Sequence, residues 1–256
     1  MPIRNVIINV ADVARSVEFY RKHLDAIPIG EPTAEHALLD VVVGTLELRR
    51  LDGGGPSPWQ DADTNRGFRH VGFKVANVDE IAVGLDEDGV RYRLRPIDID
   101  DAGVRISFFF DPDGTVVEIV ENHVTYHEVF DEAVVAAERR MPVPPRPRLD
   151  HVGHAVADLD AAVERYRPAG FADMGILDWG HMRIDYLRGG ETVLELFSFP
   201  EPTQASARGL DTYGFAAVGI TGEVPGLEAL GTLDDGRTIL VDPDDLPVEL
   251  LPADDR

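Results

Sequence analysis

The chain has 256 residues, 44% of them hydrophobic and 28% charged, which suits a globular protein of one or two domains. It has no cysteine, which excludes disulfides, thiolate metal ligands and a cysteine nucleophile. Its formal net charge of −23 disfavours nucleic acid and anionic membranes as partners, because both attract basic surfaces. No apolar run approaches membrane-spanning length and the first residues lack a signal-peptide pattern, so we expect a cytoplasmic protein.

The first 52 residues predict the element order β-α-β-β-β. The β-branched run from Ile3 to Val10 predicts a strand, and Asp12 is a suitable helix N-cap. Apolar residues at helical spacing then predict a helix from Val13 to Leu24. Strands over 37–43 and 45–51 complete the unit as a hairpin.

The same order recurs along the chain. After a strand over 69–75 and a helix over 78–85, three strands follow, and the last two are joined by the turn DPDG. A third copy begins at His151, 146 residues after Asn5. A fourth copy is eroded, with room for only a short helix and a stunted strand. We number these copies as modules 1 to 4, covering residues 1–52, 66–121, 147–199 and 212–252.

A connector separates the two pairs of modules. Apolar residues between His127 and Met141 have helical spacing, and the prolines that follow cannot continue a helix. The chain therefore divides into an N-terminal half (1–122), a helical connector (123–146) and a C-terminal half (147–256).

Each module supplies one residue near the start of its first strand and one glutamate in its last strand. In module order these pairs are Asn5 with Glu47, His70 with Glu118, His151 with Glu195, and Ala217 with Glu249. Only the two middle modules carry histidine at the first position.

These repeats resemble the vicinal oxygen chelate superfamily, which includes glyoxalase I, methylmalonyl-CoA epimerase, extradiol dioxygenases and the fosfomycin and bleomycin resistance proteins. The resemblance rests on HVGFKVANVDE, HVGHAVADLD, the DPDG turn before VVEIVE, and two LEL triplets, and it covers nearly the whole chain except the connector. It implies an α+β fold in which tandem βαβββ modules form two curved mixed-sheet cups, with helices outside. Metal ligands in this superfamily come from the first and last strands of each module.

Two ways of pairing the modules are open. Pairing consecutive modules, as extradiol dioxygenases do, would give two incomplete sites. Pairing module 2 with module 3, as in glyoxalase I, would unite the four-ligand set of His70, Glu118, His151 and Glu195 in a first cup. The second cup would then hold Asn5, Glu47, Ala217 and Glu249. We prefer this exchanged pairing, because both missing histidines then fall in one cup.

The four-ligand set suits one divalent metal ion such as Ni, Co, Zn, Mn or Fe. Glu118 and Glu195 lie in apolar strands, where an unpaired carboxylate is costly to bury. A salt bridge or a solvent-facing position would also explain them.

Other residues suggest how a substrate would bind. Gly72 and Gly153, two residues after their histidines, would leave room for it beside the metal. If the apolar rows of two strands face the helices, the polar rows would line the first cup and favour an anionic or polyoxygenated small molecule. The polar residues concerned are Arg91, Arg93, His181 and Arg183. Alternating arginines on an edge strand are equally typical of a solvated face.

Three functions fit this resemblance. The first is a metal-dependent isomerase, lyase or epimerase of glyoxalase type that acts through an enediolate, with Glu118 or Glu195 as general base. The second is an extradiol-type ring-cleaving dioxygenase, which needs only one carboxylate ligand. The third is a binding protein like the bleomycin resistance proteins. A monomer and a homodimer are both compatible with the sequence.

Overall fold

The computed structural model describes residues 2–59, 65–201, 203–206 and 210–252. The helices within them are α1 (Val13–Leu24), α2 (Val78–Glu87), α3 (Glu132–Arg139), α4 (Leu159–Tyr166) and the 3-10 helix η1 (Arg167–Ala169). The strands are β1 (Ile3–Val10), β2 (Ile27–Pro28), β3 (His36–Asp40), β4 (Thr45–Arg50), β5 (Gly67–Lys74), β6 (Tyr92–Ile99), β7 (Val104–Phe110), β8 (Val116–Glu121), β9 (Glu128–Val129), β10 (Arg148–Ala155), β11 (Ala172–Asp178), β12 (Arg183–Gly189), β13 (Thr192–Ser198), β14 (Gly214–Thr221), β15 (Glu228–Thr232), β16 (Thr238–Val241) and β17 (Pro247–Leu251).

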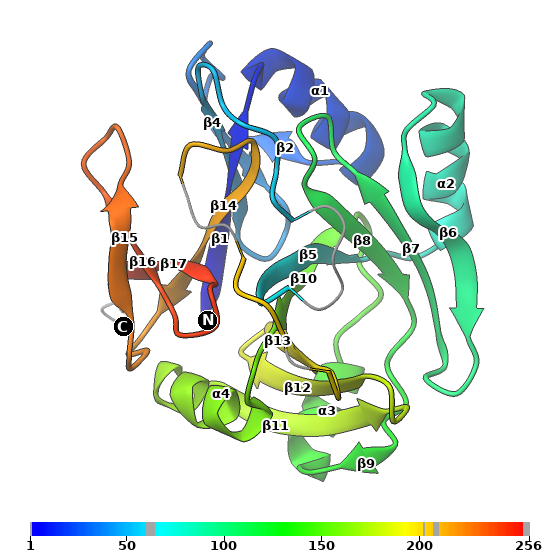
Figure 1. Ribbon diagram of the computed structural model, residues 1–256. Helices are drawn as coiled ribbons and strands as arrows, with labels where there is room; N and C mark the ends of the chain where they lie inside the picture. The colour runs from blue at the N-terminus through cyan, green and yellow to red at the C-terminus, as the bar shows by residue number, and fades with distance from the viewer. Residues whose placement is uncertain (1, 60–64, 202, 207–209, 253–256) are drawn as a thin grey trace.

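These strands form two mixed sheets, in the α+β arrangement that the sequence predicts. The eight-stranded sheet has the order β15-β16-β17-β14-β1-β4-β3-β2, and the nine-stranded sheet has the order β6-β7-β8-β5-β10-β13-β12-β11-β9. Helices α1, α2 and α4 lie at the periphery (Figure 1).

The modules exchange partners between the two halves. Strand β5 of module 2 pairs antiparallel with β10 of module 3, and β1 of module 1 pairs antiparallel with β14 of module 4. Figure 1 shows β1 and β14 side by side although they come from opposite ends of the chain. The exchanged pairing predicted from the distribution of histidines is therefore confirmed.

The two sheets share one hydrophobic core. At their junction, the ring of Phe68 in β5 stacks on that of Phe215 in β14, with centroids 3.7 Å apart and planes 4° from parallel. Trp59 meets both rings edge-on. Such contacts bury aromatic surface from both halves of the chain.

Each half is also tied together internally by a tyrosine and an aspartate. Tyr20 in α1 donates a hydrogen bond of 2.8 Å to Asp111 in the DPDG turn of module 2. Tyr166 in α4 donates one of the same length to Asp242 in the corresponding turn of module 4. Both contacts are buried, so they fix each helix against the turn of the other module in its half.

The structure departs from the sequence expectations in two segments. The connector helix is shorter than predicted. The backbone N–H groups of His127 and Phe130 donate hydrogen bonds to backbone oxygens of β11, and the helix begins only after Asp131, which caps α3. In module 4, residues 222–227 contain no helix at all.

None of the helices in the described residues is long and apolar enough to cross a bilayer.

Candidate metal centre

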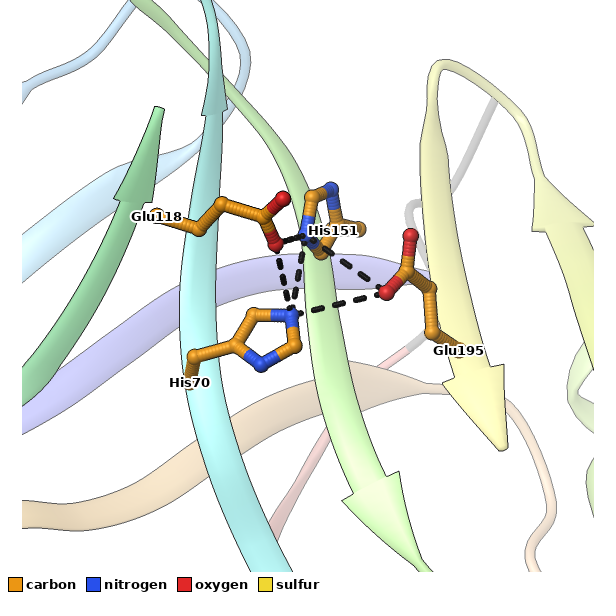
Figure 2. Close-up of side chains that lie close together, drawn as sticks. All are labelled: His70, Glu118, His151 and Glu195. Carbon is orange, nitrogen blue, oxygen red and sulfur yellow. Dashed lines mark hydrogen bonds and ion pairs between the residues drawn. The ribbon is translucent and has the colours of Figure 1, made fainter. Parts of the chain in front are cut away.

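The four-ligand set comes together in the nine-stranded sheet. His70 lies on β5, Glu118 on β8, His151 on β10 and Glu195 on β13, and Figure 2 shows the four side chains pointing toward one another. None of the four side chains is more than 10% exposed.

The donor atoms have the separations that a single cation requires. His151 Nε2 lies 2.9 Å from Glu118 Oε2 and 3.1 Å from His70 Nε2. Glu195 Oε2 lies 3.4 Å from His70 Nε2 and 3.7 Å from His151 Nε2. Two ligands about 2.1 Å from one metal ion lie about 3.0 Å apart at a right angle and about 3.4 Å apart at the tetrahedral angle. The set therefore fits a divalent ion held by nitrogen and oxygen.

The charges of the set favour a cation for a second reason. Burial alone would raise the pKa of Glu118, but the adjacent His151 and His70 outweigh it and lower that pKa to about 2. Burial would lower the pKa of His151, yet Glu195 and Glu118 raise it well above the usual value. Positive charge is thus favoured between the two carboxylates, and a metal ion can supply it in place of protons.

Two glycines make room for the imidazoles. Across the β5–β10 pair, Gly72 lies opposite His151 and Gly153 lies opposite His70. A Cβ atom on Gly72 would fall 2.0 Å from His151 Nε2, and one on Gly153 would fall 2.4 Å from His70 Cε1. The glycines are therefore occupied by the ligand side chains, and the expectation that they leave space for substrate is wrong.

An irregularity in β10 gives His151 an additional partner. The strand register shifts between Leu149 and His151, so Asp150 is an extra residue in the β5–β10 ladder. Its side chain lies in the same cavity as His151, and Asp150 Oδ2 is 3.2 Å from His151 Nδ1. A proton on Nδ1 donated to Asp150 leaves the Nε2 lone pair directed at the other ligands.

A cavity of about 550 Å³ opens above the four-ligand set. Every strand of the nine-stranded sheet except β9 contributes to its lining, together with Val124, Tyr126 and Glu138 of the connector. Most of the wall is apolar. The connector therefore covers the first cup as well as joining the halves.

The structure separates the four residues predicted to bind substrate. Arg93 and His181 line the cavity. Arg91 lies instead over the ring of Phe110, 3.6 Å from its centroid, in a different depression. The register of β6 shifts on both sides of Leu94, which ends the simple alternation assumed for its arginines.

The orientation of β12 is the reverse of the expectation. Met182, Ile184 and Tyr186 line the cavity, whereas Arg183 and Asp185 do not. The cavity side of this strand is apolar because it forms a buried cluster with β11, β13 and α3. Arg183 therefore does not line the cavity, and Arg93 and His181 are the two predicted substrate-binding residues that do.

The second cup is filled by other side chains. The guanidinium of Arg237 donates to Glu47 at 3.0 Å and to Glu249 at 3.1 Å. Asn5 Nδ2 also contacts Glu249, at 3.5 Å. The fully buried Ile7 lies opposite Ala217, at the position where the first cup has Gly153 opposite His70. A side-chain cation and a hydrophobic residue thus fill the space used for donors in the first cup.

Sequence reasoning missed Asp150, the connector residues of the cavity and Arg237. The carboxylate directly before a candidate ligand was a usable signal for Asp150, but only a bulge brings it to the same face. Nothing in the sequence marks Arg237, which lies outside the strands that carry the repeats.

Comparison with known proteins agrees with this architecture. The family model "Glyoxalase/Bleomycin resistance protein/Dioxygenase superfamily" matches residues 3–119. Two uncharacterized Bacillus subtilis proteins are similar in sequence. YraH is 30% identical over 125 residues, covering 46% of this chain and 97% of that protein, and YwkD is 30% identical over 124 residues, covering 46% and 95%.

Solved structures resemble the entire fold. Glyoxalase I from Zea mays has a TM-score of 0.69 at 20% identity, covering 98% of this chain and 92% of that one. A putative dioxygenase from Bacillus subtilis has a TM-score of 0.66 at 14% identity, covering 98% and 85%. These likenesses concern the fold alone. Together with the sequence matches, they show that the chain belongs to the glyoxalase/bleomycin resistance protein/dioxygenase superfamily.

Proposed function

We propose that this protein is a divalent-metal-dependent enzyme of glyoxalase type, an isomerase, lyase or epimerase that acts through an enediolate. The observation that carries the proposal is the convergence of two imidazoles and two carboxylates in the first cup. The set would hold Ni, Co, Zn, Mn or Fe, and its two carboxylates would balance the charge of the ion. When bound, the cation would supply Lewis-acid polarisation of a substrate carbonyl.

The residues of the chain would carry out the proton transfer. Glu195 is the better candidate for the general base, because its contacts of 3.4 and 3.7 Å are longer than those of Glu118. Glu118 lies 3.0 Å from His70 and 2.9 Å from His151, so it is held more firmly between the imidazoles. Glu195 would remove a proton next to the carbonyl and return it at the neighbouring carbon or on the other face.

Metal analysis of the purified protein tests the site directly. We expect one zinc ion per chain by elemental analysis after zinc loading and dialysis. His151→Ala should abolish this binding, whereas Asn5→Ala, the equivalent change in the second cup, should leave it unchanged. Equal effects of the two variants would refute the site, and a wild-type protein that retains no metal would favour a binding protein.

Proton exchange tests the reaction class. In D₂O, the zinc-loaded protein should replace the hydrogens on the carbon next to the carbonyl of 2-hydroxyacetophenone with deuterium. The exchange is measured as loss of their proton NMR signal. Glu195→Gln should slow this exchange at least 100-fold with less loss of zinc affinity than Glu118→Gln. The opposite ranking would assign the base to Glu118.

A ring-cleaving dioxygenase is the second candidate, because Phe108 and Phe197 lie beside the ligand His70 and Trp179 also lines the cavity. If Glu195 left the metal, the two histidines and Glu118 would form a 2-His-1-carboxylate triad. Oxygen uptake by the Fe(II)-loaded protein with catechol would support this candidate, and its absence would leave the glyoxalase-type reaction.

A further inference from the structure

The wall of the cavity above the four-ligand set is predominantly apolar. Strand β7 contributes Val104, Ile106 and Phe108, β12 contributes Ile184, and Met182 directly before β12 also lines the cavity. A volume of about 550 Å³ lies within the range of sites that enclose a molecule the size of a typical drug. Its polar side chains include the four ligands and Asp150, which contacts His151.

Aromatic rings flank the ligands at the floor of this cavity. Phe108 meets the ring of His70 edge-on at 5.1 Å, and Phe197 meets it edge-on at 5.7 Å. Aromatic pairs prefer offset or edge-to-face arrangements, so a planar ring bound beside the metal would find matching surfaces here.

Four basic side chains besides the ligands line the cavity, namely Arg69, Lys74, Arg93 and His181, and each has a partner within the protein. Lys74 is buried, and its Nζ donates 2.7 Å to the backbone oxygen of Asn122. The guanidinium of Arg69 lies 4.6 Å from the centroid of Phe197 and 5.2 Å from that of Phe199. Glu138 adds a carboxylate to the lining and contacts His123 at 2.6 Å. A substrate with several carboxylates would have to compete for these side chains with their present partners, and burying carboxylates that are not neutralised would be costly.

From this wall we infer that the substrate is a hydrophobic molecule, containing a ring system, whose two neighbouring oxygen atoms lie at one end. The inference rests on the proposed metal-dependent function for the oxygen-bearing end. The remainder of the molecule would be recognised by apolar contact with β7, β12 and the connector. A peptide-like thiol adduct with free carboxylates would match this predominantly apolar wall poorly.

Three small probes that share a pair of adjacent hydroxyl groups test this inference. Catechol has the chelating group only, naphthalene-2,3-diol adds a fused ring, and 3,4-dihydroxybenzoate adds a carboxylate. Binding to the zinc-loaded protein would be measured by calorimetry, because zinc is not redox-active. We expect naphthalene-2,3-diol to bind at least tenfold more tightly than catechol, and 3,4-dihydroxybenzoate to bind more weakly than catechol. Equal binding of the first two, or tightest binding of the carboxylate, would overturn the inference.

A pair of matched variants tests whether the apolar wall binds the ring of the probe. Ile106 lines the cavity, whereas Ile97, its partner across β6 and β7, does not and is 43% exposed. Ile106→Asp should weaken the binding of naphthalene-2,3-diol at least fivefold and that of catechol less than twofold, with zinc stoichiometry unchanged. Ile97→Asp should alter neither. Equal effects of both variants would contradict the assignment of this wall to the substrate.

Failure of the proposed metal site can be distinguished from failure of the hydrophobic-substrate inference. If no zinc binds, the proposed function is rejected, and 2-naphthol fluorescence with the metal-free protein then tests the cavity alone. Saturable 2-naphthol binding that is lost in Ile106→Asp and kept in Ile97→Asp would support a hydrophobic ligand. Absence of saturable binding would overturn that assignment too.

Discussion

Asp150 Oδ2 lies 3.2 Å from Nδ1 of His151, although the two residues are adjacent in one strand. Side chains of neighbouring residues in a regular strand point to opposite faces. The register shift in β10 removes this restriction, so that a carboxylate and the imidazole that it orients both enter the cavity. Burial alone would raise the pKa of Asp150, but Lys74 and His151 lower it, which keeps the carboxylate ionised.

The first prediction concerns this contact. Asp150→Ala should weaken zinc binding about 10- to 100-fold, because the carboxylate fixes the tautomer and orientation of His151. Asp150→Asn should weaken binding less, since its amide oxygen can still accept from Nδ1. Competition with a chelator of known affinity measures the change, with the exposed Asp52→Asn as control. Unchanged affinity in Asp150→Ala would show that His151 is oriented by packing alone.

The second prediction concerns the glycine opposite His151. Gly72→Ala should reduce zinc affinity more than tenfold, because the added Cβ would fall 2.0 Å from the imidazole and displace it. Gly84→Ala in α2 is the control: its Cβ would meet only His23, at an ordinary 3.7 Å, and should stabilise the helix slightly. Circular dichroism would establish that both variants are folded. Full zinc affinity in a folded Gly72→Ala protein would contradict the close packing of ligand and glycine.

The third prediction concerns the filled second cup. Arg237→Ala should destabilise the protein by about 1–3 kcal/mol, because it leaves Glu47 and Glu249 buried without their shared cation; the partial exposure of Arg237 limits the loss. Adding Glu249→Gln to this variant should recover part of the stability by removing one of the two charges. Urea unfolding measures both steps, and zinc stoichiometry should remain one in each. A double variant less stable than Arg237→Ala would contradict repulsion between the carboxylates.

The fourth prediction concerns pH. Burial and the nearby Asp173 raise the pKa of Asp185 to about 6, against about 3.9 in an unfolded chain. Between about pH 4 and 6 the folded state therefore binds a proton at Asp185 that the unfolded state does not. The contribution of Asp185 to the free energy of unfolding falls over this range and is lost above the folded-state pKa. Asp185 Oδ1 also has no hydrogen-bond partner among the described residues.

Asp185→Asn should consequently be more stable than the natural chain at pH 8, by up to about 3 kcal/mol, with the difference vanishing near pH 4. The comparison uses urea unfolding at several pH values, with Asp52→Asn as an exposed control. A constant difference across this range would mean that the amide substitution acts through packing.

The sequence predicted the topology because repetition is visible in it. The 146-residue spacing between Asn5 and His151, and the uneven distribution of histidines, sufficed to predict which strands pair. Helix α1 has the predicted limits, since the Asp12 cap and the apolar spacing act locally.

The sequence did not predict which face of a strand meets the cavity. Met182, Ile184 and Tyr186 are hydrophobic, and hydrophobic residues suit a helix-covered face and an apolar cavity equally well. Register shifts in β6 and β10 also depend on the partner strand, so alternation in one strand alone misplaced Arg91 and overlooked Asp150.

The exchange of modules between the halves has an evolutionary consequence. If two identical half-length chains formed these sheets, each replacement of a histidine would appear in both cups simultaneously. Joining the halves in one polypeptide makes the cups genetically independent. One cup could then acquire Ile7 and Arg237 and become a structural element, while selection on the other preserved its donors.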